Sequence, residues 1–199
     1  MLQYITQNDN ERFSIEEQCQ MFIEGGGAWI QLKSEGLSDD RIRILANELI
    51  PLCKESSTIL TIEDRPELAK ELGVHGVYLS AGAEKSAAAV REEFGAEAII
   101  GVEVGSSQAI LSLKGRDIDY VTLRPGVSQE EASRIIKEAN EAGNEMPIVL
   151  IGSFSIDDAE WIMSTGASGI ATGHSIISSS DPVKFTEDFI AKLNSCRQQ

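Results

Sequence analysis

The sequence lacks the cysteine pairs that cross-link secreted domains or hold zinc. Its three cysteines, Cys19, Cys53 and Cys196, are scattered, odd in number and without C-x-x-C spacing. Such cysteines are typical of reduced thiols and argue against a disulfide framework. No apolar run approaches membrane-spanning length, and the first residues are too few and too polar for a signal peptide. These features predict a cytoplasmic protein.

Basic residues are also scarce. The chain has 17 Lys and Arg against 32 Asp and Glu, which gives a formal net charge of -15. Nucleic acids and anionic membranes require basic patches, so this balance argues against both as the main partner. With 199 residues, 42% of them hydrophobic, the chain can bury one substantial core. A single domain over residues 1–199 is the simplest interpretation.

Eight short apolar runs alternate with helical patterns along the whole chain. The runs lack polar alternation, which is typical of strands covered on both faces of a parallel sheet. The strands are expected at residues 2–6, 28–32, 58–62, 74–79, 98–102, 118–123, 148–151 and 169–172. Helices are expected between them, including one over 84–94, with Ser14, Ser38 and Ser128 as caps. Eight strand–helix units predict a (β/α)8 TIM barrel; a doubly wound open sheet is the alternative.

The last two expected strands both end in glycine and small hydroxyl residues. Free backbone N–H groups at such strand ends favour a phosphate, and barrels often build their phosphate site after strands 7 and 8. The predicted phosphate-binding residues are Gly152, Ser153, Thr172, Gly173 and His174.

Polar residues also follow the second, third and sixth strands. Gln31, Lys33 and Glu35 follow the second strand, and Glu63-Asp64-Arg65 follows the third. Adjacent acids can hold Mg2+, although the same residues are equally suited to capping the next helix and pairing locally. Arg124, after the sixth strand, suits an anion because its planar guanidinium matches phosphate.

Several of these segments resemble the thiamine-phosphate synthase family and its thiazole tautomerase relatives. The resemblance covers nearly the whole chain. It rests on Trp29-Ile-Gln-Leu-Lys33, on residues 61–69 and 73–79, on Ile118-Asp-Tyr-Val121, and on the stretches 147–152 and 166–170. The resemblance implies a (β/α)8 enzyme that joins a hydroxymethylpyrimidine diphosphate to a thiazole phosphate. In that reaction the pyrimidine substrate ionises first, and Mg2+ and cationic side chains hold the departing diphosphate.

The resemblance also implies roles for individual residues. Gln31 would contact the pyrimidine, while Asp64 would ligate Mg2+, with Glu63 in the family's Asn position. Arg65 would support the metal-binding loop. Lys33 replaces a family arginine and keeps its charge, and Gly152 with the 172–174 turn would hold the thiazole phosphate. The predicted catalytic residues are Gln31, Lys33, Arg65 and Arg124, and the predicted metal ligands are Glu63 and Asp64.

The chain departs from the family pattern at several strand ends. Glu35 replaces a lysine, Tyr78 and Ser80 replace His and Gly, and residues 101–105 read Gly-Val-Glu-Val-Gly in place of Gly-x-Ser-x-His. The carboxylate expected after the fourth strand has only Glu84 nearby. Two alternatives to a synthase therefore stay open: a non-catalytic phosphoester binder or regulator, and a tautomerase-like isomerase with Glu103 or His174 as its base. Trp29 and Trp161 suit internal packing and a homodimer interface equally.

Overall fold

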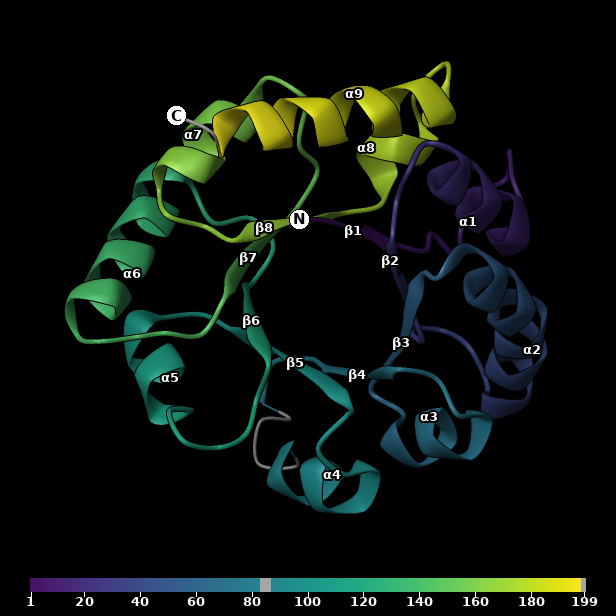
Figure 1. Ribbon diagram of the computed structural model, residues 1–199, viewed down its shortest axis with the longest axis horizontal. Helices are drawn as coiled ribbons and strands as arrows, with labels where there is room; N and C mark the ends of the chain where they lie inside the picture. The colour runs from purple at the N-terminus through teal and green to yellow at the C-terminus, as the bar shows by residue number, and fades with distance from the viewer. Residues whose placement is uncertain (83–86, 198–199) are drawn as a thin grey trace.

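Eight parallel strands close into a barrel inside a ring of helices (Figure 1). This computed structural model describes residues 1–82 and 87–197. The strands are β1 (Leu2–Ile5), β2 (Trp29–Leu32), β3 (Ile59–Glu63), β4 (Gly76–Leu79), β5 (Ile99–Val104), β6 (Tyr120–Leu123), β7 (Ile148–Ile151) and β8 (Gly169–Thr172). Each strand pairs with its sequence neighbours, and β8 returns to β1 with Tyr4 opposite Thr172. The predicted (β/α)8 barrel is confirmed, and the open-sheet alternative is wrong.

Helices connect the strands in the predicted order. They are α1 (Ile15–Glu24), α2 (Asp39–Ser56), α3 (Pro66–Leu72), α4 (Ala87–Phe94), α5 (Ser107–Ser112), α6 (Gln129–Glu141), α7 (Asp158–Ser164), α8 (His174–Ile177) and α9 (Pro182–Cys196). The predicted caps are confirmed: the hydroxyls of Ser14, Ser38 and Ser128 each accept a hydrogen bond from the first turn of their helix. The start of the helix expected over 84–94, including Glu84, lies outside the described residues. No helix among the described residues is long and apolar enough to cross a membrane.

Two apolar clusters hold this arrangement together. The larger one lies between the strands and the surrounding helices, where burial of apolar side chains is the main stabilising term. The smaller one fills the barrel, with Tyr78 and Tyr120 as its largest members. Gly101 makes room there, since a Cβ atom at this position would lie 2.2 Å from the Tyr120 ring. The barrel is therefore a packed core, and ligands are restricted to its mouth.

Both tryptophans pack inside the chain. The ring of Trp29 meets Tyr120 edge-on with centroids 4.9 Å apart, and Trp161 packs against Phe154. Several strand boundaries differ from the expectation by one or two residues, and two differences concern segments named above. β4 begins at Gly76, so His75 lies before the strand, exposed, and accepts a hydrogen bond from the Leu60 N–H. The chain after β8 also forms the separate short helix α8, which apolar periodicity cannot reveal in four residues.

Candidate active site

One cavity of about 510 Å³ opens at the carboxyl ends of the barrel strands. In (β/α)8 barrels this face carries the active site, because the loops after the strands converge there. The predicted residues that line the cavity are Gln31, Lys33, Glu63, Gly152, Ser153, Thr172, Gly173 and His174. Residues more than 140 positions apart in the sequence thus share one site. Asp64, Arg65 and Arg124 do not line it.

The residues Gly152, Ser153, Thr172, Gly173 and His174 form one side of the cavity, called here the β7–β8 rim. Among the described residues, none accepts a hydrogen bond from the amides of Ser153, Gly173 or His174. The Gly152 amide already donates to the Ala171 carbonyl at 3.1 Å. The Thr172 hydroxyl is buried, and no described residue pairs with it. The β7–β8 rim therefore presents several unused hydrogen-bond donors, which a phosphate would satisfy.

Gly173 lets this rim fold tightly against β1. A Cβ atom at this position would lie 2.1 Å from both the Ile5 carbonyl oxygen and the Gln7 side-chain nitrogen. The Gln7 side chain in turn donates to the Ile5 and Thr6 carbonyls at 2.9 and 3.2 Å. Gln7 lines the cavity as well. Because the backbone at Gly173 lies so close to β1, there is no space for a side chain at this position, which explains the glycine.

Gln31 lies at the base of the cavity and is 1% exposed. Its Oε1 accepts a hydrogen bond from Gln3 Nε2 at 3.4 Å, and the same Gln3 nitrogen donates to the Tyr120 hydroxyl at 3.2 Å. No described residue accepts from the Gln31 Nε2. An unpaired buried donor is costly unless a ligand meets it. Gln31 is therefore suited to donating to a bound molecule, while Gln3 fixes its orientation.

Lys33 is the only lysine or arginine among the described residues that line the cavity. Its ammonium lies 2.6 Å from the Glu35 carboxylate. The hydrogen bond to Glu35 raises the pKa of Lys33, and the same bond lowers the pKa of Glu35. Because Glu35 is largely exposed, this ion pair is weak and leaves Lys33 free to exchange it for an anionic ligand.

The two predicted metal ligands point to different partners. Glu63 lines the cavity, and its Oε2 accepts from the Ser34 N–H at 2.9 Å. Asp64 has a φ of 49°. Both of its carboxylate oxygens accept hydrogen bonds from Ser80, one from the backbone N–H at 2.8 Å and one from the hydroxyl at 2.5 Å. Among the described residues there is no group of three or more His, Cys, Asp or Glu placed to hold a metal. A metal here would need most of its ligands from substrate and water.

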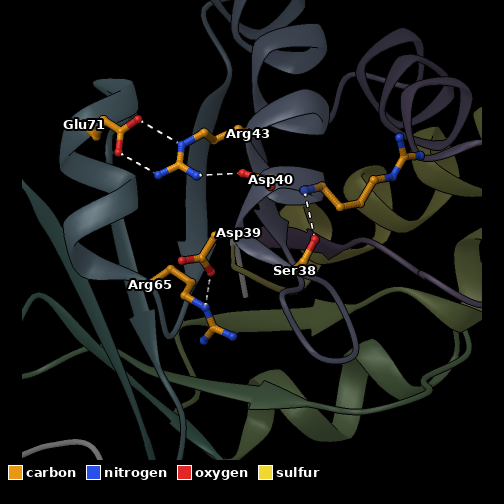
Figure 2. Close-up of polar contacts among 7 residues, drawn as sticks. Ser38, Asp39, Asp40, Arg43, Arg65 and Glu71 are labelled. Carbon is orange, nitrogen blue, oxygen red and sulfur yellow. Dashed lines mark hydrogen bonds and ion pairs between the residues drawn. The ribbon is translucent and has the colours of Figure 1, made fainter.

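Arg65 and Arg124 lie beside the cavity. The Arg65 guanidinium donates to the Asp39 carboxylate of α2 at 3.1 Å (Figure 2) and to the Asp64 carbonyl at 2.9 Å. It therefore braces the turn after β3. The Arg124 guanidinium lies 3.7 Å from Glu131 and is largely exposed. Its neighbours Pro125 and Gly126 reach the cavity wall.

Burial raises the pKa of Glu63 above its ordinary value of 4.5, although the Ser34 N–H opposes this effect. The folded protein then binds the Glu63 proton more tightly than the unfolded chain does. The stabilisation that Glu63 contributes to the folded protein is present below pH 4.5, and it is lost as the pH rises through the pKa of Glu63 in the folded state. We therefore expect Glu63→Gln to unfold at a higher temperature than wild type at pH 7.5, with the difference shrinking at pH 4.

Thermal unfolding at the two pH values checks this expectation, with exposed Glu92→Gln as the matched control. Glutamine keeps an oxygen that can accept from Ser34. A Glu63→Gln protein less stable than wild type at pH 7.5 would contradict it.

Tyr78 and Glu103 also line the cavity; Tyr78 was not a predicted site residue, and Glu103 was named only as a possible base in the isomerase alternative. Both residues stand at positions where the family motif has a different residue. Comparison with the motif therefore assigns no role to them. Strand alternation was the available signal, since it places Tyr78 on the inner face of β4 and Glu103 on that of β5. Their side chains are in contact, with the Tyr78 hydroxyl donating to Glu103 Oε2 at 3.3 Å.

The fold and this cavity define a (β/α)8-barrel protein with a small-molecule site at the carboxyl ends of its strands. Residues 2–176 match the family model described as thiamine monophosphate synthase. The chain is 33% identical to the thiamine-phosphate synthase of Bacteroides fragilis over 198 residues, which covers 94% of this chain and 96% of that protein. It is 31% identical to the Bacteroides thetaiotaomicron enzyme, covering 95% of each. The chain therefore belongs to the thiamine monophosphate synthase family.

A solved structure supports the fold. Thiamine phosphate pyrophosphorylase from Pyrococcus furiosus superposes with a TM-score of 0.83 at 22% sequence identity, covering 98% of this chain and 96% of that one.

Proposed function

We propose that this protein is a thiamine-phosphate synthase, which joins hydroxymethylpyrimidine diphosphate to thiazole phosphate and releases diphosphate. The observation that carries the proposal is that one cavity has unused amide donors on one side and Gln31 and Lys33 on another, in a chain of this family. Two anionic substrates can therefore meet in one place. Reduced thiols at its three free cysteines are consistent with a cytoplasmic enzyme.

The β7–β8 rim is the proposed site of the thiazole phosphate. Amides of Ser153, Gly173 and His174 would donate to its oxygens, with the Thr172 hydroxyl as a fourth donor. Gly152 would contribute by its small size, since its amide is already used. Hydrogen bonds to a charged oxygen are about twice as strong as neutral ones, so these donors would fix the thiazole firmly.

The other substrate would lie against β2 and β3. The free Gln31 Nε2 would donate to the pyrimidine ring, and Lys33 would exchange Glu35 for the diphosphate. Arg65 would hold the turn after β3, and Arg124 would add positive charge at the edge of the cavity. Holding both substrates in one orientation can supply much of the rate enhancement in such a joining reaction.

Mg2+ fits this donor set. Glu63 and Asp64 provide hard carboxylate oxygens at one strand end, and Mg2+ ordinarily takes one or two carboxylates together with phosphate oxygens of the substrate. When bound, the ion would neutralise charge on the diphosphate. The protein's own contribution is to position Glu63 through Ser34, while Asp64, which Ser80 holds outside the cavity lining, would have to turn toward the ion.

The proposal is tested by incubating the purified protein with both substrates and Mg2+ and measuring thiamine phosphate by chromatography. We expect product that depends on both substrates and on enzyme concentration. Thermal shift with thiazole phosphate alone accompanies the assay. Stabilisation by this ligand without any product at high enzyme concentration would identify a non-catalytic binder and overturn the proposal.

A further inference from the structure

Glu103 is a cavity residue with no role in the proposed synthase reaction as described so far. It lies near the end of β5, lines the cavity and is half-buried. No lysine, arginine or histidine among the described residues forms an ion pair with it. A partly buried carboxylate without a positive partner is unfavourable unless a ligand compensates it.

A buried chain of hydroxyl groups holds this carboxylate in place. The Tyr78 hydroxyl donates to Glu103 Oε2 at 3.3 Å and lies 2.7 Å from the Thr122 Oγ1. Since the phenol has one proton, Thr122 donates to Tyr78 when Tyr78 donates to Glu103. Burial also holds the pKa of Tyr78 well above its usual value, so the phenol stays a donor at neutral pH. Tyr78 and Thr122 are both at most 1% exposed, which makes this support rigid.

The cavity has an uneven distribution of charge and donors. The β7–β8 rim offers unused backbone donors and has no carboxylate, whereas Glu63 and Glu103 place carboxylates on the β3 and β5 side. Gln31, whose buried Nε2 has no partner among the described residues, lines the same cavity. A ligand that satisfies all of these groups has an anionic end and a positively charged middle.

We propose that Glu103 is a catalytic residue, whose carboxylate stabilises the positive charge that develops on the pyrimidine as diphosphate leaves. The inference rests on the proposed function. In that reaction the bond between the pyrimidine methylene carbon and the diphosphate oxygen breaks, and its electron pair leaves with the diphosphate. The thiazole nitrogen then gives its lone pair to the methylene carbon, and the positive charge passes to the thiazolium ring of the product. Glu103 exchanges no proton in these steps.

Glu103→Gln tests the charge while keeping the size and the contact with Tyr78. We expect kcat to fall about 100-fold, as when one preorganised electrostatic group is removed, with the KM for thiazole phosphate unchanged. Glu103→Asp should recover part of the loss, and Glu92→Gln on the exposed face of α4 should behave as wild type. A kcat for Glu103→Gln within 3-fold of wild type would overturn the inference.

Binding measurements separate this role from simple damage to the cavity. By calorimetry, Glu103→Gln should bind the cationic product thiamine phosphate more weakly while its affinity for inorganic diphosphate is kept or improved. Equal loss for both ligands would indicate a structural role and overturn the inference. If wild type forms no thiamine phosphate, the proposed function fails, and the contrast between the two ligands still reports on Glu103.

Tyr78 is the positioning residue in this scheme. Tyr78→Phe removes the donor to Glu103, and we expect a smaller loss of kcat than in Glu103→Gln. Because Tyr78 acts through Glu103, adding Tyr78→Phe to Glu103→Gln should cause little further loss. Fully additive effects in this double-mutant cycle would contradict the positioning role.

Discussion

Gly173→Ala should nearly abolish the use of thiazole phosphate. The added Cβ would lie 2.1 Å from the Ile5 carbonyl oxygen, so the backbone after β8 must move away from β1. That movement would misplace the free amides of Gly173 and His174. Losing two hydrogen bonds to a charged group, at roughly 2 kcal/mol each, predicts a rise of about 1,000-fold in the KM for thiazole phosphate. Steady-state kinetics with the pyrimidine substrate saturating measures it.

A second glycine controls for general destabilisation. Gly115 has a φ of 76°, and an added Cβ there would meet no heavy atom within 4 Å. Gly115→Ala should therefore lower the unfolding temperature through backbone strain while leaving both KM values unchanged. If Gly173→Ala behaved in the same way, the β7–β8 rim would not be the site of the thiazole phosphate.

Lys33→Met should lower kcat by about three orders of magnitude, the effect of removing a cation that stabilises charge on a transferring phosphoryl group. Among the described residues that line the cavity, no other lysine or arginine can replace it. Methionine keeps the apolar stem of the side chain, so the loss reports on the charge. Rapid-quench measurement of a single turnover isolates the step in which diphosphate leaves.

Two further variants test the charge of Lys33 and its ion pair with Glu35. Lys33→Arg should retain much of the activity, because it keeps the charge. Glu35→Gln should improve the affinity for inorganic diphosphate by about 3-fold, since the exposed ion pair that competes for Lys33 is worth less than 1 kcal/mol. A Lys33→Met enzyme with kcat near wild type would contradict the role of Lys33 in neutralising the leaving group.

The sequence was sufficient to predict the barrel and the two glycine-containing strand ends that line its cavity. Ile148–Ile151 and Gly169–Thr172 are β7 and β8 as expected, because buried parallel strands leave an unbroken apolar run and the glycines after them mark close backbone approach. Position in such a barrel then places the residues after these strands at the cavity, with Gln31 and Lys33 on the other side of β1.

Side-chain direction was not predictable in the same way. Asp64 and Arg65 follow β3 as the motif requires, yet one turns to Ser80 and the other to Asp39 of α2. Ser80 follows β4 and Asp39 begins α2, and the Asp64 side chain also depends on a positive φ that the sequence does not reveal. The contact between Glu103 and Tyr78 was not predicted for a related reason: it joins residues of two strands 25 positions apart.

The most direct test of the account is a crystal structure with thiazole phosphate, inorganic diphosphate and Mg2+ bound together. The predicted result places the thiazole phosphate within hydrogen-bond distance of the amides of Ser153, Gly173 and His174. The diphosphate should lie against Lys33, which has left Glu35. Thiazole phosphate bound elsewhere, with the β7–β8 rim holding neither ligand, would contradict the account.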